Sequence, residues 1–270
     1  MRDTVDIQGS ALAERREMIQ QRLLDGASGA EAMDALTELV DGLIIGRYRN
    51  DLRRLGEAAE ITASQACCLV ALGGYGRREL APHSDIDLMV LFKPDATAMI
   101  PELVKTVLHP LWDAGFQVGH SVRTIQECLD LAAEDLTIRT SMMEARFLAG
   151  SAQLFQEFHD RYARRIVGKS VDRFIDQKLE ERRREYEKFG ATVYLLEPNV
   201  KKSQGGLRDR VREHRKAAKE GAQGGVPARL QPVAPGALSR AAQVGGALLP
   251  RVPSRVLPAR QGREAAVPAP

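Results

Sequence analysis

The chain has 270 residues, 44% hydrophobic and 28% charged, with a formal net charge of +3, enough to bury the core of one large domain or two small ones. No apolar run approaches the ~20 residues that span a bilayer, and the first ten residues do not resemble a secretory signal, so we expect neither a membrane protein nor a secreted one. The three cysteines, two of them adjacent (Cys67 and Cys68), form neither a disulfide framework nor a zinc cluster, which favours a cytoplasmic location.

Two helices are expected at the N-terminus. Residues 10–25 form a polar pattern with few apolar positions, whereas residues 30–56 carry a strong apolar stripe. The stripe recurs at helical spacing and consists of Leu36, Leu39, Val40, Leu43 and Ile44. We therefore expect this second helix to lie on the core.

Short strands and helices alternate in the next part of the chain. The apolar runs at 67–72, 85–92 and 116–122 predict strands. Helices are predicted between and after them, at 77–80, 101–114, 124–133, 137–149, 152–166 and 172–189. This order predicts an α/β (α+β) fold, with a small mixed sheet, N-terminal helices and a C-terminal helical segment.

The composition changes after Asp209. Residues 1–209 hold 28 Lys and Arg against 33 Asp and Glu, whereas residues 210–270 hold 11 against 3. The last fifty residues contain eleven Ala, eight Pro and seven Gly, too little apolar surface to offset the entropy of ordering. We expect either a disordered tail or residues from a shifted reading frame of a GC-rich gene. Since the basic charge belongs to this tail, no nucleic-acid partner is expected.

One segment carries the pattern of a chemical site, residues 72–88 (LGGYGRRELAPHSDIDL). Because side chains alternate along a strand, Asp85 and Asp87 project from the same face. Two carboxylates at this spacing can share divalent cations, and Mg²⁺ prefers such oxygen ligands together with substrate phosphates. The pair therefore predicts a magnesium site.

The two glycines before these carboxylates predict a phosphate cradle. Gly73 and Gly74 follow a strand and open a turn, where backbone N–H groups can approach a polyphosphate closely. Positioning a triphosphate beside two metal ions is the chemistry of nucleotidyl transfer. A dinucleotide fingerprint is excluded because Glu79 stands where its third glycine belongs, and a Walker loop is excluded because its Gly-Lys-Ser/Thr ending is missing. A hairpin-like turn with exposed acids is the structural alternative.

The same stretch resembles the polymerase-β-like nucleotidyltransferase superfamily, and more closely the bacterial [protein-PII] uridylyltransferase/uridylyl-removing enzymes. Three further segments resemble that family in the same order: 111–124 (LWDAGFQVGHSVRT), 135–150 (DLTIRTSMMEARFLAG) and 196–209 (LEPNVKKSQGGLRD). The resemblance covers roughly residues 30–209, and it ends where the composition changes. We therefore expect an N-terminal fragment of such an enzyme.

The resemblance implies a nucleotidyltransferase fold and Mg²⁺-dependent transfer of UMP from UTP to a tyrosine of the PII signal protein. It also implies an HD hydrolase domain and ACT sensor domains, for which we find no counterpart in this chain. The expected organisation is an N-terminal helix over 1–29, a nucleotidyltransferase core over 30–150, a helical segment over 151–209 and the tail over 210–270. The alternatives are a related protein adenylyltransferase of the type acting on glutamine synthetase, and a non-catalytic nucleotide-binding fragment.

Further residues are weaker candidates. Ser84 and Arg77 are candidates for phosphate contacts, although Arg77 could instead form an ion pair. A third carboxylate is common in the superfamily, and Glu144 and Asp135 are the candidates here. The basic residues around the second diglycine are candidates for contacts with UTP or PII: Lys201, Lys202 and Arg208.

Other polar and aromatic residues are given structural roles. We expect Trp112 in the core and His120 to be a structural histidine. The pair His159-Asp160 is expected on a helix surface, because no companion metal histidines accompany it. The run Arg182-Arg183-Arg184 is expected to be solvated.

Overall fold

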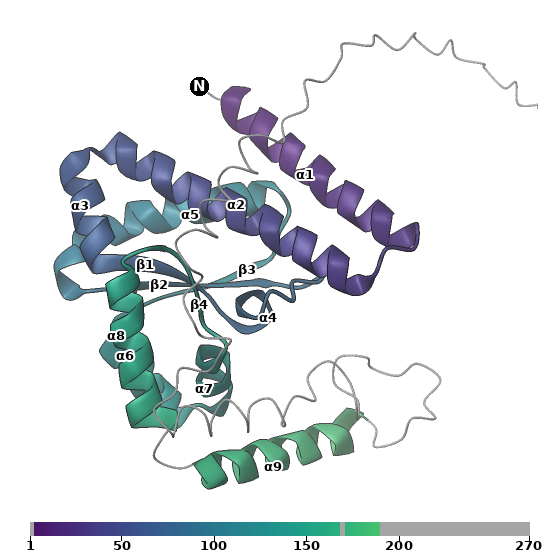
Figure 1. The fold of residues 1–270 in the computed structure, drawn as a ribbon, viewed down its shortest axis with the longest axis vertical. Coiled ribbons are helices and arrows are strands. Elements are labelled where there is room, and N and C mark those ends of the chain that lie inside the picture. The colour runs from purple at the N-terminus through teal and green to yellow at the C-terminus, as the bar shows by residue number, and fades with distance from the viewer. Residues whose placement is uncertain (1–2, 168–170, 190–270) are drawn as a thin grey trace, which may run out of the picture.

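A four-stranded sheet lies at the centre of the computed structural model, which describes residues 3–167 and 171–189 (Figure 1). The strand order is β3-β2-β1-β4. Strand β1 pairs antiparallel with β2 and β4, while β2 and β3 are parallel, so the predicted small mixed sheet is confirmed. The strands are β1 (Cys67–Ala71), β2 (Ile86–Phe92), β3 (Val118–Arg123) and β4 (Arg146–Gly150).

Helices cover both faces of this sheet (Figure 1). One face carries α1 (Asp3–Leu24), α2 (Gly29–Leu55), α3 (Glu57–Ala66) and α5 (Ile100–Asp113). The other face carries α6 (Ile125–Glu134), α7 (Leu136–Met143), α8 (Ala152–Tyr162) and α9 (Val171–Phe189). Three short helices complete the described chain: α4 (Gly73–Gly76), a 3₁₀ helix at Pro94–Met99 and a π-helical turn at Ala163–Val167.

Alternation along β1 divides the core into two apolar clusters. Cys67 and Leu69 pack into the cluster under α2 and α5, whereas Cys68 and Val70 pack into the cluster under α6 and α8. All five residues of β1 are buried. The central strand is thus hydrophobic on both faces, as expected for a strand covered by helices on each side.

Helix α2 forms as its sequence predicts. Ser28 caps its N-terminus, accepting a hydrogen bond from the Glu31 N–H, while the Glu31 carboxylate accepts one from the Ser28 N–H. The apolar stripe faces the core, with Leu36, Val40 and Ile44 almost fully buried. This long helix thereby becomes a fixed platform beside the sheet.

Two predictions of local structure are wrong. The short helix lies at Gly73–Gly76 rather than at 77–80, because Arg78 adopts a left-handed conformation with φ of 62° that ends it. Residues 137–149 were expected to form one helix, but α7 ends at Met143 and residues 146–150 form β4. Pairing with β1 selects the strand there, and such tertiary contacts override local propensity.

No helix among the described residues is both long enough and apolar enough to cross a bilayer. The predictions for the tail, residues 210–270, lie outside the described residues.

Candidate active site

The diglycine turn lies directly beside the acidic end of β2. The Leu72 N–H donates a hydrogen bond of 2.9 Å to the Asp87 carbonyl oxygen, which joins the end of β1 to the start of β2. The chain then enters α4 at Gly73, whose φ of 55° lies in the left-handed region that glycine tolerates best. The strand and turn predicted from sequence therefore meet the predicted carboxylates in space.

The Asp87 carboxylate occupies a space that two glycines leave open. A Cβ atom on Gly73 would lie 3.0 Å from Asp87 Oδ2, and one on Gly119 would lie 2.8 Å from Asp87 Oδ1. Gly119 is the residue opposite Asp87 in the parallel pairing of β2 with β3. The side chain of Asp87 thus lies between the diglycine turn and β3, and a side chain at either glycine would have to displace it.

Asp85 lies immediately before β2 and is exposed to solvent, as is Asp87, while Ile86 between them is buried. The Ile86 N–H donates to the Gln117 carbonyl oxygen at 2.9 Å, so the backbone here already continues the strand. Alternation then directs both carboxylates away from the apolar cluster that takes up Ile86. The structure brings Asp85, Asp87 and Gly73 to the same end of the sheet.

These oxygens suit a hard divalent cation. Carboxylates accessible to solvent, in a space kept clear by glycines, match the preference of Mg²⁺ for one or two carboxylates together with waters or phosphates. Across residues 3–167 and 171–189, no group of three or more His, Cys, Asp or Glu side chains is arranged to hold a metal ion. Asp85 and Asp87 would therefore hold such an ion as a pair of protein ligands.

The two candidates for a third carboxylate are engaged elsewhere. Asp135 caps α7, accepting a hydrogen bond of 2.8 Å from the Ile138 N–H. Glu144 accepts a hydrogen bond of 2.5 Å from Arg77 Nη1. A role for either residue as a metal ligand stays a prediction.

Arg77 is held between two carboxylates next to the turn. Its Nε donates to Glu79 at 2.8 Å while Nη1 donates to Glu144. Although burial disfavours the charged form, these two neighbours raise the pKa of Arg77 above its usual value. The ion pair that sequence left as an alternative is present, and a phosphate contact by Arg77 or by the partly buried Ser84 stays a prediction.

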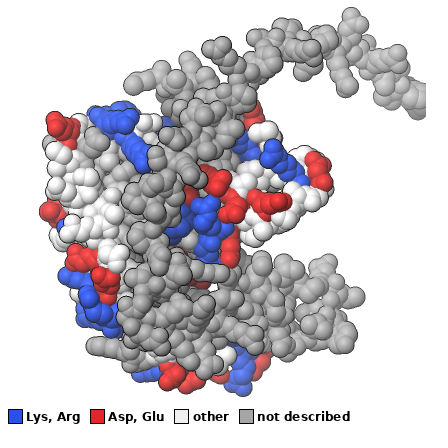
Figure 2. Space-filling model, viewed as in Figure 1, with Lys and Arg blue, Asp and Glu red and all other residues white. Residues whose placement is uncertain are grey.

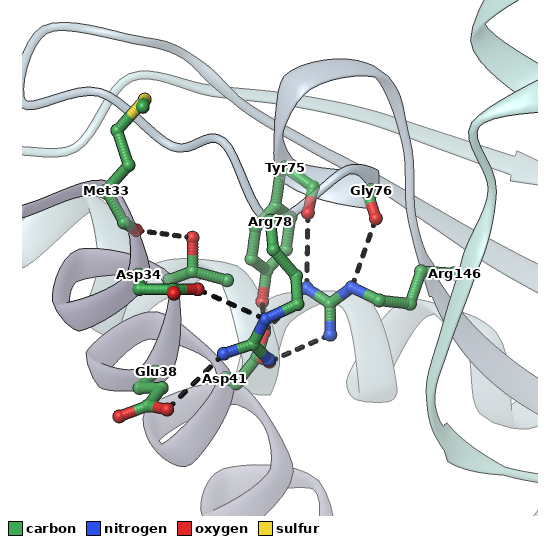
Figure 3. A network of polar contacts seen from close by, with 9 residues as sticks. Met33, Asp34, Glu38, Asp41, Tyr75, Gly76, Arg78 and Arg146 are labelled. Carbon is green, nitrogen blue, oxygen red and sulfur yellow. Dashed lines mark hydrogen bonds and ion pairs between the residues drawn. The ribbon is translucent and has the colours of Figure 1, made fainter. Parts of the chain in front are cut away.

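A buried polar network lies behind the turn (Figure 3). Arg146 of β4 donates to both carboxylate oxygens of Asp41 on α2, at 2.8 and 3.0 Å. The Tyr75 hydroxyl donates to Asp41 Oδ1 at 2.6 Å. The Arg146 guanidinium also donates to the carbonyl oxygens of Tyr75, at 3.1 Å, and of Gly76, at 3.2 Å. Three segments of the chain, α2, α4 and β4, therefore converge on one ion pair.

The surroundings of Tyr75 and Arg146 determine their protonation states. Burial, followed by the neighbouring Asp41 carboxylate, raises the pKa of Tyr75 well above its ordinary value, so the phenol stays protonated and donates. Burial opposes the charge on Arg146, but its bonds to Asp41 outweigh it and raise the pKa of Arg146. The result is a neutral phenol beside the ion pair of Arg146 with Asp41.

Sequence reasoning did not single out this network, although two signals point to it. Asp41 is an acid beside the apolar stripe of α2, next to the buried Val40. Arg146 is a cation inside the apolar run 145–149. A charge within an apolar pattern indicates a buried pair, because an isolated buried charge is too costly to keep.

Opposite charges are interspersed around the turn. Figure 2 shows basic and acidic side chains side by side on the described part of the face viewed. The guanidinium of Arg78 lies 3.4 Å from Asp34, 3.3 Å from Glu38 and 3.7 Å from Asp41, all on α2 (Figure 3). These contacts hold Arg78, which follows α4, against α2, the helix to which the Tyr75 hydroxyl is also bound.

Two structural expectations are wrong and a third holds only in part. Trp112 is 46% exposed rather than in the core, and its ring lies 6.2 Å from that of His120, which is itself exposed. His159 is buried, and neither ring nitrogen has a hydrogen-bond partner among the described residues. Arg183 and Arg184 are solvated as expected. Arg182 is buried, because it continues the i, i+4 row of Phe174 and Lys178 on the inner side of α9. The loop candidates Lys201, Lys202 and Arg208 lie outside the described residues.

Family comparisons match both ends of the described fold. The model for the nucleotidyltransferase family DUF294 matches residues 13–124, which include the turn and both carboxylates. The model for GlnD PII-uridylyltransferase matches residues 173–212, beginning within α9. The candidate site therefore lies inside a region similar to nucleotidyltransferases.

Individual relatives extend this similarity. The chain is 40% identical over 205 residues to a bifunctional uridylyltransferase/uridylyl-removing enzyme of Caulobacter vibrioides, covering 76% of this chain and 22% of that protein. It is 40% identical over 208 residues to the protein of the same name from Phenylobacterium zucineum, covering 77% and 22%. The match to that of Cereibacter sphaeroides is 43% over 175 residues, covering 65% and 19%. The chain thus spans about a fifth of the length of these relatives.

Proposed function

Because the chain is a homologue of part of the bifunctional uridylyltransferase/uridylyl-removing enzymes, we propose that it catalyses transfer of UMP from UTP to a tyrosine hydroxyl of a PII signal protein. The observation that carries this proposal is the contact of the diglycine turn with the Asp87 carboxylate at the end of β2. That arrangement brings a backbone suited to phosphate and a carboxylate suited to a metal into one place.

The proposed reaction is a displacement at the α-phosphorus of the nucleotide. The tyrosine oxygen forms the new bond to phosphorus, the bond to the bridging oxygen breaks, and pyrophosphate leaves with that bonding pair. The hydroxyl proton passes to solvent or to a nearby base. Mg²⁺, when bound, would neutralise charge on the phosphates during this displacement.

The residues of this chain contribute position and charge. Asp85 and Asp87 would hold the cation at the exposed end of the sheet, and Gly73 and Gly119 leave their side chains room to do so. Gly74 brings backbone close to the triphosphate without a side chain in the way. Such fixed placement lowers the barrier because no reorganisation is needed during the reaction.

The choice of UTP and of PII rests on sequence similarity. The described residues do not identify the base of the nucleotide, whereas the family description that matches 173–212 names PII-uridylyltransferase. The name of these relatives, uridylyltransferase/uridylyl-removing enzyme, gives uridylyl as the group in both activities. A cytoplasmic location, where UTP and PII are both available, belongs to the same proposal.

The experiment is a transfer assay on the whole chain. Purified protein is mixed with PII, a Mg²⁺ salt and α-labelled UTP or, in a second arm, α-labelled ATP. We expect label on PII with UTP, and none when PII lacks its acceptor tyrosine. Label only with ATP would replace the proposal by adenylyl transfer, and UTP binding without transfer would leave a nucleotide-binding role only.

Matched variants show whether the candidate site is responsible. Asp87→Asn and Asp85→Asn remove one metal-binding charge each and are expected to lower the transfer rate by about 10³-fold, the size expected when metal-assisted charge stabilisation is lost. Asp130→Asn, an exposed acid on α6, is the control and should transfer like the parent. Equal rates for the parent and both site variants would contradict the assignment.

A further inference from the structure

Behind the diglycine turn lies a buried ion pair between two residues far apart in the sequence. Asp41 and Arg146 are 105 positions apart and bind each other through both carboxylate oxygens (Figure 3). Arg146 is 9% exposed and Asp41 7%. An apolar pair of similar volume is often as stable as a buried ion pair, so stability alone does not explain why charges stand here.

The hydrogen bonds that Arg146 donates to backbone carbonyls indicate which part of the chain the ion pair holds in place. Its Nε donates to the Gly76 carbonyl and its Nη2 to the Tyr75 carbonyl, the last two of α4. Carbonyls at the end of a helix have no partner within it, and a planar guanidinium can serve two of them while also gripping a carboxylate. The position of the C-terminal end of α4 is therefore set by Arg146.

Steric contact fixes the same end. A Cβ on Gly76 would lie 2.0 Å from the Glu144 carbonyl oxygen, so α4 is pressed against the residues that lead into β4. The side chain of Tyr75 is fully buried. Its ring lies 5.2 Å from the Arg146 guanidinium, and its hydroxyl is bound to Asp41. The hydrogen bonds of Arg146, the close approach of Gly76 to Glu144 and the burial of Tyr75 together fix the position of α4.

The other end of that turn lies against the carboxylate of the candidate site. A single helical turn is about 6 Å long and stiff, because its backbone is hydrogen-bonded internally. Here the Gly76 N–H donates to the Leu72 carbonyl at 2.8 Å and the Arg77 N–H to the Gly73 carbonyl at 3.1 Å. A shift at Gly76 would therefore move Gly73, which borders Asp87 Oδ2.

We propose that Arg146, together with Asp41 and Tyr75, is a positioning residue that holds the Gly73–Gly76 turn against Asp87 for nucleotide binding, a role that rests on the proposed function. None of the three needs to touch the nucleotide. Their effect passes through the backbone of α4, so losing them loosens the turn first and nucleotide affinity as a consequence.

The test uses the full chain and two independent measurements. Arg146→Met keeps the length of the side chain and removes its donors, whereas Arg146→Lys keeps the charge without the planar fork. Arg139→Met is the matched control, because Arg139 on α7 is also partly buried and donates to a backbone carbonyl, that of Ile166, at 2.7 Å. It lies on the face of the sheet opposite α2.

Hydrogen exchange measures the anchor without reference to function. In Arg146→Met, amide exchange in peptides covering residues 72–80 should rise about tenfold, in line with the loss of buried hydrogen bonds, while α6 stays protected. In Arg139→Met these peptides should exchange like the parent. Unchanged exchange at 72–80 in folded Arg146→Met would overturn the anchoring role, whatever the protein binds.

Titration with UTP in the presence of Mg²⁺ measures the consequence. Affinity should fall about tenfold in Arg146→Met and less in Arg146→Lys, and should be unchanged in Arg139→Met. Faster exchange with unchanged UTP affinity would overturn the positioning role. A parent that binds no UTP would contradict the proposed function, and with it the positioning role, while the exchange result would still decide the anchor.

Tyr75→Phe keeps the proposal testable if Arg146→Met does not fold. It retains the buried ring and the pair of Arg146 with Asp41 and removes only the bond from the hydroxyl to Asp41. We expect a smaller increase in exchange at 72–80 and a loss of UTP affinity of a few fold, as for one buried hydrogen bond. No change in either quantity would overturn the proposal.

Discussion

The two faces of the sheet are stabilised in different ways. On the face of α2, Asp41 and Arg146 are joined by hydrogen bonds that fix direction as well as distance. On the opposite face, aromatic rings follow one another along α8, with Phe155 5.8 Å from Phe147, Phe158 6.2 Å from Phe155, and Tyr162 5.8 Å from Phe158. Apolar burial stabilises both faces but has no preferred direction, so on the face of α2 the polar network specifies geometry in addition.

The largest expected effect tests the aromatic face. Phe158→Ala removes a fully buried ring and should lower the free energy of unfolding by about 3–5 kcal/mol. Below the unfolding transition the variant should bind UTP like the parent, because Phe158 belongs to the apolar cluster on the face of the sheet opposite α2. Chemical denaturation monitored by circular dichroism gives the first quantity, and calorimetric titration gives the second.

The control for this change is another large aromatic residue in a different environment. Trp112→Ala removes a ring that is 46% exposed and should cost less than about 1 kcal/mol, the range for a surface substitution. If Phe158→Ala weakened UTP binding while still folded, the geometry of the turn would depend on the aromatic face as well as on the polar network.

A smaller effect is expected at Gly119, which borders the Asp87 carboxylate. In Gly119→Ala the added Cβ would lie 2.8 Å from Asp87 Oδ1, so the carboxylate must move. We expect the transfer rate to fall about 10²-fold, as for a catalytic group displaced by about 1 Å. Gly115→Ala is unsuitable as a control, because Gly115 has a φ of 74°, whereas Gly46→Ala introduces a Cβ in open space.

Stability should change little in Gly119→Ala, and comparing its melting temperature with that of the parent checks this. A normal transfer rate would show that Asp87 adjusts without loss, and that its placement between Gly73 and Gly119 is not needed for the reaction.

The smallest effect is a pH dependence on the aromatic face. His159 is buried, and burial lowers its pKa below 6.5, while Asp160, 3.9 Å away, opposes this shift. Above pH 6.5 the ring is neutral in both the folded and the unfolded state, so it does not make the free energy of unfolding depend on pH. As the pH falls below 6.5 the unfolded chain gains a proton that the folded one excludes, so stability should decrease by about 1 kcal/mol per pH unit until the folded pKa is reached.

Urea denaturation of the parent and of His159→Leu at pH 7.5 and 5.5 measures this dependence. The parent should lose more stability than the variant between these two values. Parallel losses would mean that His159 takes up a proton in the folded state, and that its unbonded nitrogens are open to water.

The local patterns of the sequence predicted the elements that depend on periodicity. The stripe of α2 and the apolar runs of β1 and β2 correspond to the observed elements within a few residues. Strand β4 was missed because residues 142–149 contain Met, Glu, Ala and Leu, good helix formers, and only pairing with β1 makes residues 146–150 a strand.

The site divides in the same way. Asp85, Asp87 and Gly73 were found from one motif, because the turn that joins them is local in sequence. The role of Gly119 depends on the parallel pairing that sets it opposite Asp87, which the motif itself does not contain. The pair of Asp41 and Arg146 depends on the packing of α2 against β4, which no local pattern specifies.

The long separation between Asp41 and Arg146 also bears on how the chain acquires its structure. A contact closing 105 residues forms late, because the entropy of the intervening loop must first be reduced by nearer contacts. During synthesis, the stretch from Gly73 to Asp87 leaves the ribosome well before Arg146 does. A nascent chain of that length would contain every residue of the motif while its turn still lacked the partner that holds it in place.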